Sequence, residues 1–289
     1  MEIQLQTLTP LWTGGVDGTT DRLHETGLIG SLRWWYEALV RGLGGYACDP
    51  TSEDRCPDNN GKHCAACELF GCTGWARKFR LRVLDKDGKL VTEAIQADQT
   101  ITLEFLEMRP MSQEEKWLLN RAVWIAATYG ALGGKTTLKP QKGPMGEDYG
   151  IFSWIGSTQV SKPTNIKTHF QQFRQATNPP KFPNLRHFFF VKGAFFDRLQ
   201  INSLMGLDEK GKPIPNADNT QKSLRGKRGQ EETMPAISKK IFSFKSNGGR
   251  IWGYAKDAQM RDTVIERIKQ KLGDGSYTKK TGEEVLHEL

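Results

Sequence analysis

The order of two kinds of hydrophobic period over residues 1–154 constrains the fold more than any other feature. Alternation of apolar and polar residues is typical of strands, and apolar residues at helical spacing are typical of amphipathic helices. Six segments carry these periods in the order strand, helix, strand, strand, helix, strand: 1–11, 26–42, 77–84, 99–106, 112–129 and about 150–154. The first strand is expected to start at a sheet edge and to end at Pro10. Because this order is that of a ferredoxin-like unit, the sequence predicts one such module over 1–154.

The helix expected at 26–42 has an apolar face and a charged face. The stripe predicted to face the core consists of Leu28, Leu32, Trp35 and Leu39. The opposite face carries Arg33, Glu37 and Arg41 at the i,i+4 spacing of ion pairs. Gly27 and Gly30 at the entrance let the backbone approach a ligand, and the free N–H groups of a first helical turn favour anions. Trp34 lies off the core stripe, where its ring could stack on a base or cover a neighbouring element.

Residues 155–289 are predicted to form a second ferredoxin-like module of sheet and helix. The expected elements are a short helix at 163–175, a buried strand or strand pair at 186–199, a hairpin of 237–244 and 250–254, and a helix at 257–272. The polar stretch at about 205–235 is expected to be a mobile loop. The predicted fold class is therefore α+β, with two ferredoxin-like modules and a cysteine-rich insertion at 46–72.

The charge of the chain favours a polyanionic partner. Its 289 residues have a net charge of +8, and the isoelectric point is about 9.2. No apolar run reaches the roughly 20 residues that span a bilayer, and the N-terminus lacks the pattern of a signal peptide. We therefore expect a cytoplasmic protein without a membrane partner.

All five cysteines lie between Cys48 and Cys72, which is typical of a metal site or of plain thiols. Cys64-Ala-Ala-Cys67 has the spacing of a zinc knuckle, and four thiolates suit a closed tetrahedral structural zinc site. The predicted ligands are Cys48, Cys56, Cys64 and Cys67, with Cys72 and His63 as further candidates. The alternative is an exposed loop with unpaired thiols.

A loop rich in glycine and lysine is expected at 130–150, with Lys135, Lys139 and Lys142. It is not a P-loop, because Gly130 and Gly134 are one residue too close and because a helix rather than a strand precedes it. The lysines could follow a phosphate backbone, or the loop could be a solvated connection between two domains.

The five histidines are scattered, and the sequence has neither an HExxH pattern nor a nucleophile elbow. His24 lies beside the entrance of the helix at 26–42, where it could act as a general base on a ribose hydroxyl. A hydrogen-bonding or stacking role for His24 is favoured over catalysis, so no catalytic residue is predicted.

Three stretches together resemble a known family. They are Thr9-Pro-Leu-Trp-Thr-Gly-Gly15, Glu25-Thr-Gly-Leu-Ile-Gly-Ser-Leu-Arg-Trp-Trp-Tyr-Glu-Ala-Leu-Val-Arg-Gly42 and Cys67-Glu-Leu-Phe-Gly-Cys-Thr-Gly-Trp-Ala-Arg-Lys-Phe-Arg80. This combination resembles the first RAMP subunit family of the type III-B CRISPR effector, the Cmr complex, within the RAMP superfamily. The loop at 130–150 is similar to the RAMP glycine-rich loop, from which it departs in having Pro140 and Pro144.

The resemblance implies two RRM-like RAMP modules in one chain and a non-catalytic subunit of an antiviral ribonucleoprotein. Its implied partners are the 3′ part of the CRISPR RNA, target RNA and other RAMP subunits of the Cmr complex. The implied RNA contacts are Arg22, His24, Arg33, Trp34, Arg41, Arg77, Lys78, Lys135, Lys139 and Lys142.

Two other functions remain open from the sequence. One is a metal-independent RAMP endoribonuclease with His24 as its base. The other is an assembly subunit whose basic surface meets an acidic protein and never touches RNA.

Overall fold

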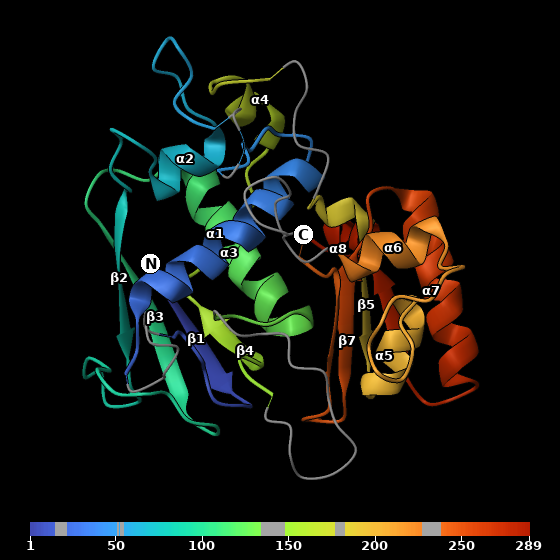
Figure 1. Ribbon diagram of the computed structural model, residues 1–289. Coiled ribbons are helices and arrows are strands. Elements are labelled where there is room, and N and C mark those ends of the chain that lie inside the picture. The colour runs from blue at the N-terminus through green and yellow to red at the C-terminus, as the bar shows by residue number, and fades with distance from the viewer. Residues whose placement is uncertain (15–21, 51, 53–54, 134–147, 177–182, 227–237) are drawn as a thin grey trace. The chain divides into compact units, whose positions relative to one another are not determined.

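The computed structural model describes residues 1–14, 22–50, 52, 55–133, 148–176, 183–226 and 238–289 (Figure 1). Among these residues the chain forms two compact units. The first unit contains the described residues of Met1–Thr136, with Tyr149–Asn184 and Leu286–Leu289, and the second contains Leu185–Val285. Each unit holds one four-stranded antiparallel sheet. The chain is therefore a mixed α/β protein, as the α+β prediction requires.

The first unit follows the predicted order of strands and helices, with one unpredicted short helix in the insertion and the short helix expected at 163–175 after the last strand. Its elements are β1 (Glu2–Thr7), α1 (Glu25–Gly42), α2 (Ala65–Phe70), β2 (Phe79–Leu84), β3 (Thr100–Glu107), α3 (Gln113–Tyr129), β4 (Phe152–Ser157) and α4 (Ile166–Gln171). The sheet order is β2-β3-β1-β4. β1 lies between β3 and β4, so the expected edge position for the first strand is wrong. The reason is that β1 pairs with strands from both halves of the unit.

The core of the first unit forms where α1 and α3 pack against the apolar side of the sheet. Leu28, Leu32, Trp35 and Leu39 are all buried, which confirms the predicted stripe on α1. α3 begins with the predicted capping box, because the Ser112 hydroxyl accepts from the Glu115 N–H and the Glu115 carboxylate accepts from the Ser112 N–H. Apolar residues alternate along β2 and β3 as predicted, with Phe79, Leu81, Val83, Ile101, Leu103 and Phe105 directed inward.

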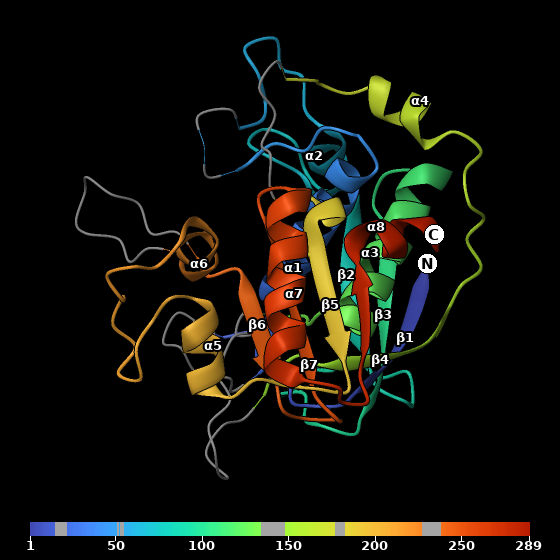
Figure 2. The ribbon, with the colours of Figure 1, turned by 90° about the vertical axis from the view of Figure 1, so that its right-hand side faces the viewer.

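The second unit contains β5 (Phe188–Lys192), α5 (Arg198–Leu204), α6 (Asn219–Arg225), β6 (Ile241–Phe244), β7 (Arg250–Tyr254), α7 (Ala258–Leu272), β8 (Thr278–Thr281) and α8 (Gly282–His287), with a 3-10 turn η1 (Leu185–His187) before β5. Its sheet order is β6-β7-β5-β8. The predicted hairpin is confirmed as β6 and β7, and the predicted last helix as α7. Figure 2 shows α7 beside this sheet, and residues of α5, α6 and α7 share one apolar core with β5 and β7.

Three features of residues 155–226 differ from the sequence-based expectations. The two units divide near residue 184 rather than 154, because α4 and the residues after it contact the cysteine-bearing insertion. The buried strand expected at 186–199 is only five residues long, and Phe195 beyond it is 37% exposed. Within the stretch expected to be a mobile loop, residues 205–226 instead include α6, whose Leu224 is fully buried in the core. The remainder, 227–235, lies outside the described residues.

Candidate metal centre

The insertion between α1 and β2 folds around its cysteines. Cys64 is the N-cap of α2, and its sulfur accepts a hydrogen bond from the Cys67 N–H at 3.5 Å. The helix ends at Gly71, whose φ of +86° is a conformation that favours glycine. A Cβ atom there would also meet the Trp75 carbonyl oxygen at 2.8 Å. The Cys64-Ala-Ala-Cys67 step is therefore one tight helical turn that directs two sulfurs to the same side.

Four cysteine sulfurs converge in this insertion. The Sγ atoms of Cys48, Cys56, Cys64 and Cys67 all lie within 4.8 Å of one another, and all four residues are buried. Cys48 Sγ and Cys67 Sγ are 3.6 Å apart. In a tetrahedron with metal–sulfur bonds of about 2.3 Å the sulfurs would be roughly 3.8 Å apart, so this set fits a four-coordinate ion. The four ligands predicted from sequence are thus the four that the structure brings together.

The two further candidate ligands lie elsewhere. Cys72 is half-buried and does not belong to the group of four sulfurs. His63 Nε2 pairs with the Glu68 carboxylate, and its ring packs against Trp75 at a centroid distance of 4.4 Å with the two planes tilted by 33°. His63 is therefore engaged with the surface of the insertion rather than with the sulfurs.

Backbone and thiol hydrogen bonds surround the sulfurs. The Cys64 N–H donates to Cys56 Sγ at 3.3 Å, and the Cys48 N–H donates to Cys64 Sγ at 3.4 Å. Hydrogen bonds from the Cys48 thiol lower the pKa of Cys56 and of Cys64, and the same contacts raise the pKa of Cys48. N–H donors directed at sulfur stabilise the thiolate form, which is the form that binds metal ions.

Arg33, one of the predicted RNA contacts, lies against this centre. Its Nη2 donates to Cys67 Sγ at 3.1 Å, and its Nη1 donates to the Gly71 carbonyl at 2.9 Å. Its Nε donates to Glu37 Oε1 at 2.7 Å. All three nitrogens of the guanidinium thus serve contacts inside the first unit.

Arg41 is enclosed in the same way. The residue is only 6% exposed, and its guanidinium donates to the carbonyls of Ala47, Cys48 and Pro183. Glu37 lies between the two arginines, and burial raises its pKa even though both arginines favour its ionised form. The predicted i,i+4 ion pairs therefore exist, but they lie under the insertion instead of on an open helix face. Arg41 therefore joins α1 to the start of the insertion.

Lys78 also serves an internal contact. Its ammonium pairs with Glu68 Oε1 at 2.5 Å and donates to both oxygens of Glu115, at 2.9 and 3.1 Å. Glu115 is fully buried and also completes the capping box of α3. Lys78 therefore joins α2 in the insertion to the first turn of α3.

The remaining predicted RNA contacts are distributed differently. Arg22 and Arg77 are exposed, and Arg77 Nε donates to the Phe79 carbonyl at 3.0 Å. Trp34 is half-buried with its ring edge-to-face on Trp35 at 5.1 Å. His24 is the N-cap of α1, and its backbone N–H donates to Thr13 Oγ1. Lys135, Lys139 and Lys142 lie outside the described residues.

Sequence reasoning missed one residue of the metal centre, Arg174. It follows α4, and its Nη1 donates to Cys56 Sγ at 3.5 Å and to the Arg55 carbonyl at 3.1 Å. The Arg174 N–H donates to the His63 carbonyl at 3.0 Å. No sequence signal could have found it, because more than a hundred residues separate Arg174 from Cys56.

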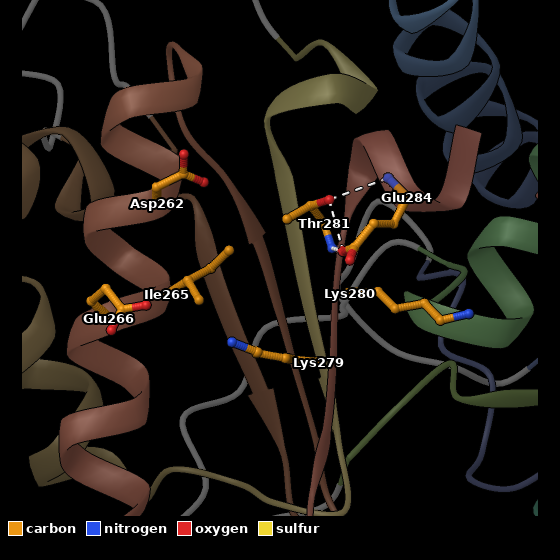
Figure 3. A pocket seen from close by; sticks show the side chains of 7 residues that line it. All are labelled: Asp262, Ile265, Glu266, Lys279, Lys280, Thr281 and Glu284. Carbon is orange, nitrogen blue, oxygen red and sulfur yellow. Dashed lines mark hydrogen bonds between the residues drawn. The ribbon is translucent and has the colours of Figure 1, made fainter. Parts of the chain in front are cut away.

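A separate pocket of about 210 Å³ lies at the edge of the second sheet (Figure 3). Its lining is Asp262, Ile265 and Glu266 of α7, Lys279, Lys280 and Thr281 of β8, and Glu284 of α8. Thr281 donates to the Glu284 carboxylate through its backbone N–H and its hydroxyl. The lining has charges of both signs and contains none of the site residues predicted from the sequence.

One protein family matches the first part of the chain. The family model described as the RAMP superfamily matches residues 4–138. These residues include the first sheet's β1, β2 and β3, helices α1 and α3, and the cysteine-bearing insertion. The match confirms the RAMP resemblance for this part of the chain. A comparison with curated proteins finds no match.

Two solved structures are similar to this chain over nearly its whole length. A chain of the type III-B Cmr-beta bound to cognate target RNA and AMPPnP is 12% identical, with 94% of this chain and 99% of that chain covered and a TM-score of 0.50. Apo Cmr1 from Pyrococcus furiosus is also 12% identical, with coverage of 97% and 98% and a TM-score of 0.49. At this identity the likeness concerns the fold alone. In the described part of the chain, none of the helices combines the length and the apolar character needed to cross a membrane.

Proposed function

We propose that this protein is an RNA-binding, non-catalytic RAMP subunit of a type III-B CRISPR effector. The observation that carries the proposal is the match of residues 4–138 to the RAMP superfamily, the region in which the three resembling sequence stretches lie. The net charge of +8 supports a polyanionic partner. Its partners would be CRISPR RNA, target RNA and other RAMP subunits of the Cmr complex.

Both units are interpreted as ferredoxin-like modules. In each unit the first strand of the chain lies between the third and the fourth, and the second strand lies at the edge next to the third. Helices follow the first and third strands in both. This order supports two RRM-like RAMP modules, as the sequence predicts.

The four-cysteine centre is proposed to hold a structural zinc ion. Four buried sulfurs within 4.8 Å of one another support a closed tetrahedral site with no open position for chemistry. The ion would fix an insertion that has few apolar residues of its own outside α2. The proposal assigns zinc to folding and not to RNA cleavage.

The contacts of the candidate side chains divide them into less suitable and more suitable candidates for RNA binding. Arg33, Arg41 and Lys78 have their charged groups in internal contacts, so they are poor candidates for phosphate. Arg22 and Arg77 are exposed. Arg22 and His24 lie just before α1, Trp34 lies on α1, and Arg77 follows the insertion. We propose these four, together with Lys135, Lys139 and Lys142 in the resembling glycine-rich loop, as the RNA surface.

The test is a binding titration of single-stranded RNA with the intact protein over a range of salt concentrations. The variant is Arg22→Ala combined with Arg77→Ala, and the matched control is Arg82→Ala, whose guanidinium pairs with Glu104 on the sheet. Each lost phosphate contact should reduce the slope of log K against log salt by about 0.7. The double variant should bind more weakly with a shallower slope, and the control should not differ from the parent protein.

Unchanged affinity and slope in the double variant would contradict the proposed surface. Absence of any RNA crosslink to this chain inside an assembled effector would contradict RNA binding itself and favour the protein-only assembly role. Cleavage of RNA by the purified protein in EDTA, lost in His24→Ala, would contradict the non-catalytic assignment.

A further inference from the structure

Two arginines from outside the insertion reach two of the four sulfurs. Arg33, on α1, places Nη2 at 3.1 Å from Cys67 Sγ. Arg174, which follows α4, places Nη1 at 3.5 Å from Cys56 Sγ. The four-cysteine group is thus contacted by guanidinium groups from two segments that lie on either side of the insertion in the sequence.

Both guanidinium groups are held in place by other contacts. Arg33 also binds the Gly71 carbonyl at 2.9 Å, one residue after α2, and it pairs with Glu37. Arg174 also binds the Arg55 carbonyl at 3.1 Å, lies 3.7 Å from Asp58 Oδ2, and stacks over the Tyr46 ring at 5.6 Å. Besides sulfur, Arg33 is oriented by a carbonyl and a carboxylate, and Arg174 by a carbonyl, a carboxylate and an aromatic ring. Neither contact with sulfur is that of a freely moving surface arginine.

The two guanidinium groups can offset the negative charge of a four-thiolate metal site. A divalent ion bound by four thiolates leaves an excess of two negative charges, and all four cysteines are buried. An excess of buried charge is costly unless positive groups or N–H donors lie next to it. Residues that hydrogen-bond to metal ligands in this way tune the metal affinity of a site. Their substitution typically weakens metal binding by about 10- to 100-fold.

We propose that Arg33 and Arg174 are positioning residues of the metal centre, which stabilise the four-thiolate form and join it to α1 and to the segment after α4. This inference rests on the metal centre proposed above. Metal binding would then hold three parts of the first unit together: α1, the insertion and the segment after α4. Arg33 would act on the metal and not on RNA.

The experiment measures metal affinity in the full-length protein, by competition between the protein and a chelator for zinc and by titration with cobalt. Arg33→Met and Arg174→Met remove the charge and the N–H donors while they keep an unbranched apolar chain. Each should weaken metal binding by about 10- to 100-fold. Arg33→Lys and Arg174→Lys keep the charge and should recover part of the loss. The matched control is Arg82→Met, because Arg82 pairs with Glu104 and not with a cysteine.

The sulfur-to-cobalt charge-transfer absorption gives a second readout that a merely structural role would not change. Because N–H donors stabilise the sulfur lone pairs, their removal should move this absorption to longer wavelength in both Met variants. Equal metal affinity and unchanged absorption in the two Met variants would overturn the proposed role of the arginines. Failure of the parent protein to bind zinc or cobalt would instead overturn the metal centre itself, so the two failures are distinguishable.

Discussion

Arg33 and Arg41 lie on the face of α1 that the sequence marks as charged, yet both guanidinium groups are enclosed. The insertion folds back over this face, and backbone carbonyls of Gly71, Ala47 and Cys48 accept their hydrogen bonds. A buried arginine must have its N–H groups paired, because an unpaired charge in the interior is costly. At the scale of single residues, charged side chains at i,i+4 spacing therefore do not distinguish a face exposed to solvent or RNA from a face whose side chains bind a neighbouring segment.

Among the cysteines, the structure predicts unequal consequences of substitution. Cys67→Ser should reduce zinc retention and thermal stability, because it removes one of four converging ligands and the acceptor of the Arg33 contact. Cys72→Ser is the matched control and should retain the metal, since Cys72 lies outside the group of four. Elemental analysis of the dialysed proteins checks this prediction. Equal loss of zinc in both variants would contradict the assignment of ligands.

At the scale of elements, α6 shows how a polar stretch can still be ordered. Asp218 accepts from the Gln221 N–H at 3.0 Å and completes a capping box with the Gln221 side chain. Leu224 then reaches the core that α6 shares with α7 and the second sheet. One buried leucine and a capped first turn are a weak signal in sequence, because hydrophobic periodicity needs several apolar residues to be recognised.

The ionisation of Asp218, the N-cap of α6, should make the stability of the fold depend on pH. Partial burial is the largest single effect and opposes ionisation, but the hydrogen bond and charge of Arg267 of α7 and the backbone N–H groups of the first turn of α6 together hold the pKa of the carboxyl below its ordinary value. A carboxyl with a lowered folded-state pKa stabilises the fold above its unfolded-state pKa, and this stabilisation is lost as pH falls through the folded-state pKa.

Asp218→Asn should therefore lower the free energy of unfolding at neutral pH and leave it unchanged at a pH well below the folded-state pKa of Asp218. The loss should be under about 1 kcal/mol, because the pair with Arg267 is partly exposed and Asn still caps the helix. Denaturant unfolding of both proteins at the two pH values measures it. A difference that persists in acid would show that the Arg267 pair is not its cause.

At the scale of the whole molecule, the division between units decides which segments fold together. Phe170 of α4 is 3% exposed and lies against Gly45, where an added Cβ would come within 2.7 Å of its ring. Arg174 contacts the insertion a few residues later. Residues 155–184 therefore belong with the first unit, although they come after its last strand.

A fragment of residues 1–184 should consequently unfold cooperatively and retain the metal. A fragment of residues 1–154 should unfold less cooperatively and retain less metal. The shorter fragment lacks the Phe170 side chain that covers Gly45 and the Arg174 contact to Cys56. Calorimetric unfolding together with zinc content compares the two fragments. Equal cooperativity and zinc content would place the boundary at 154 after all.

Features that depend on neighbouring residues along the chain could be predicted from the sequence alone. The strand and helix periods of the first unit, the capping box at Ser112 and the Cys64-Ala-Ala-Cys67 turn are local features, and each is present close to where the sequence predicts it. The four sulfurs were also predictable, because their spacing reflects metal geometry. That the charged face of α1 is covered and that Arg174 reaches Cys56 is visible only in the folded chain. These facts depend on contacts between distant segments, and hydrophobic periodicity does not encode the partner of a charged side chain.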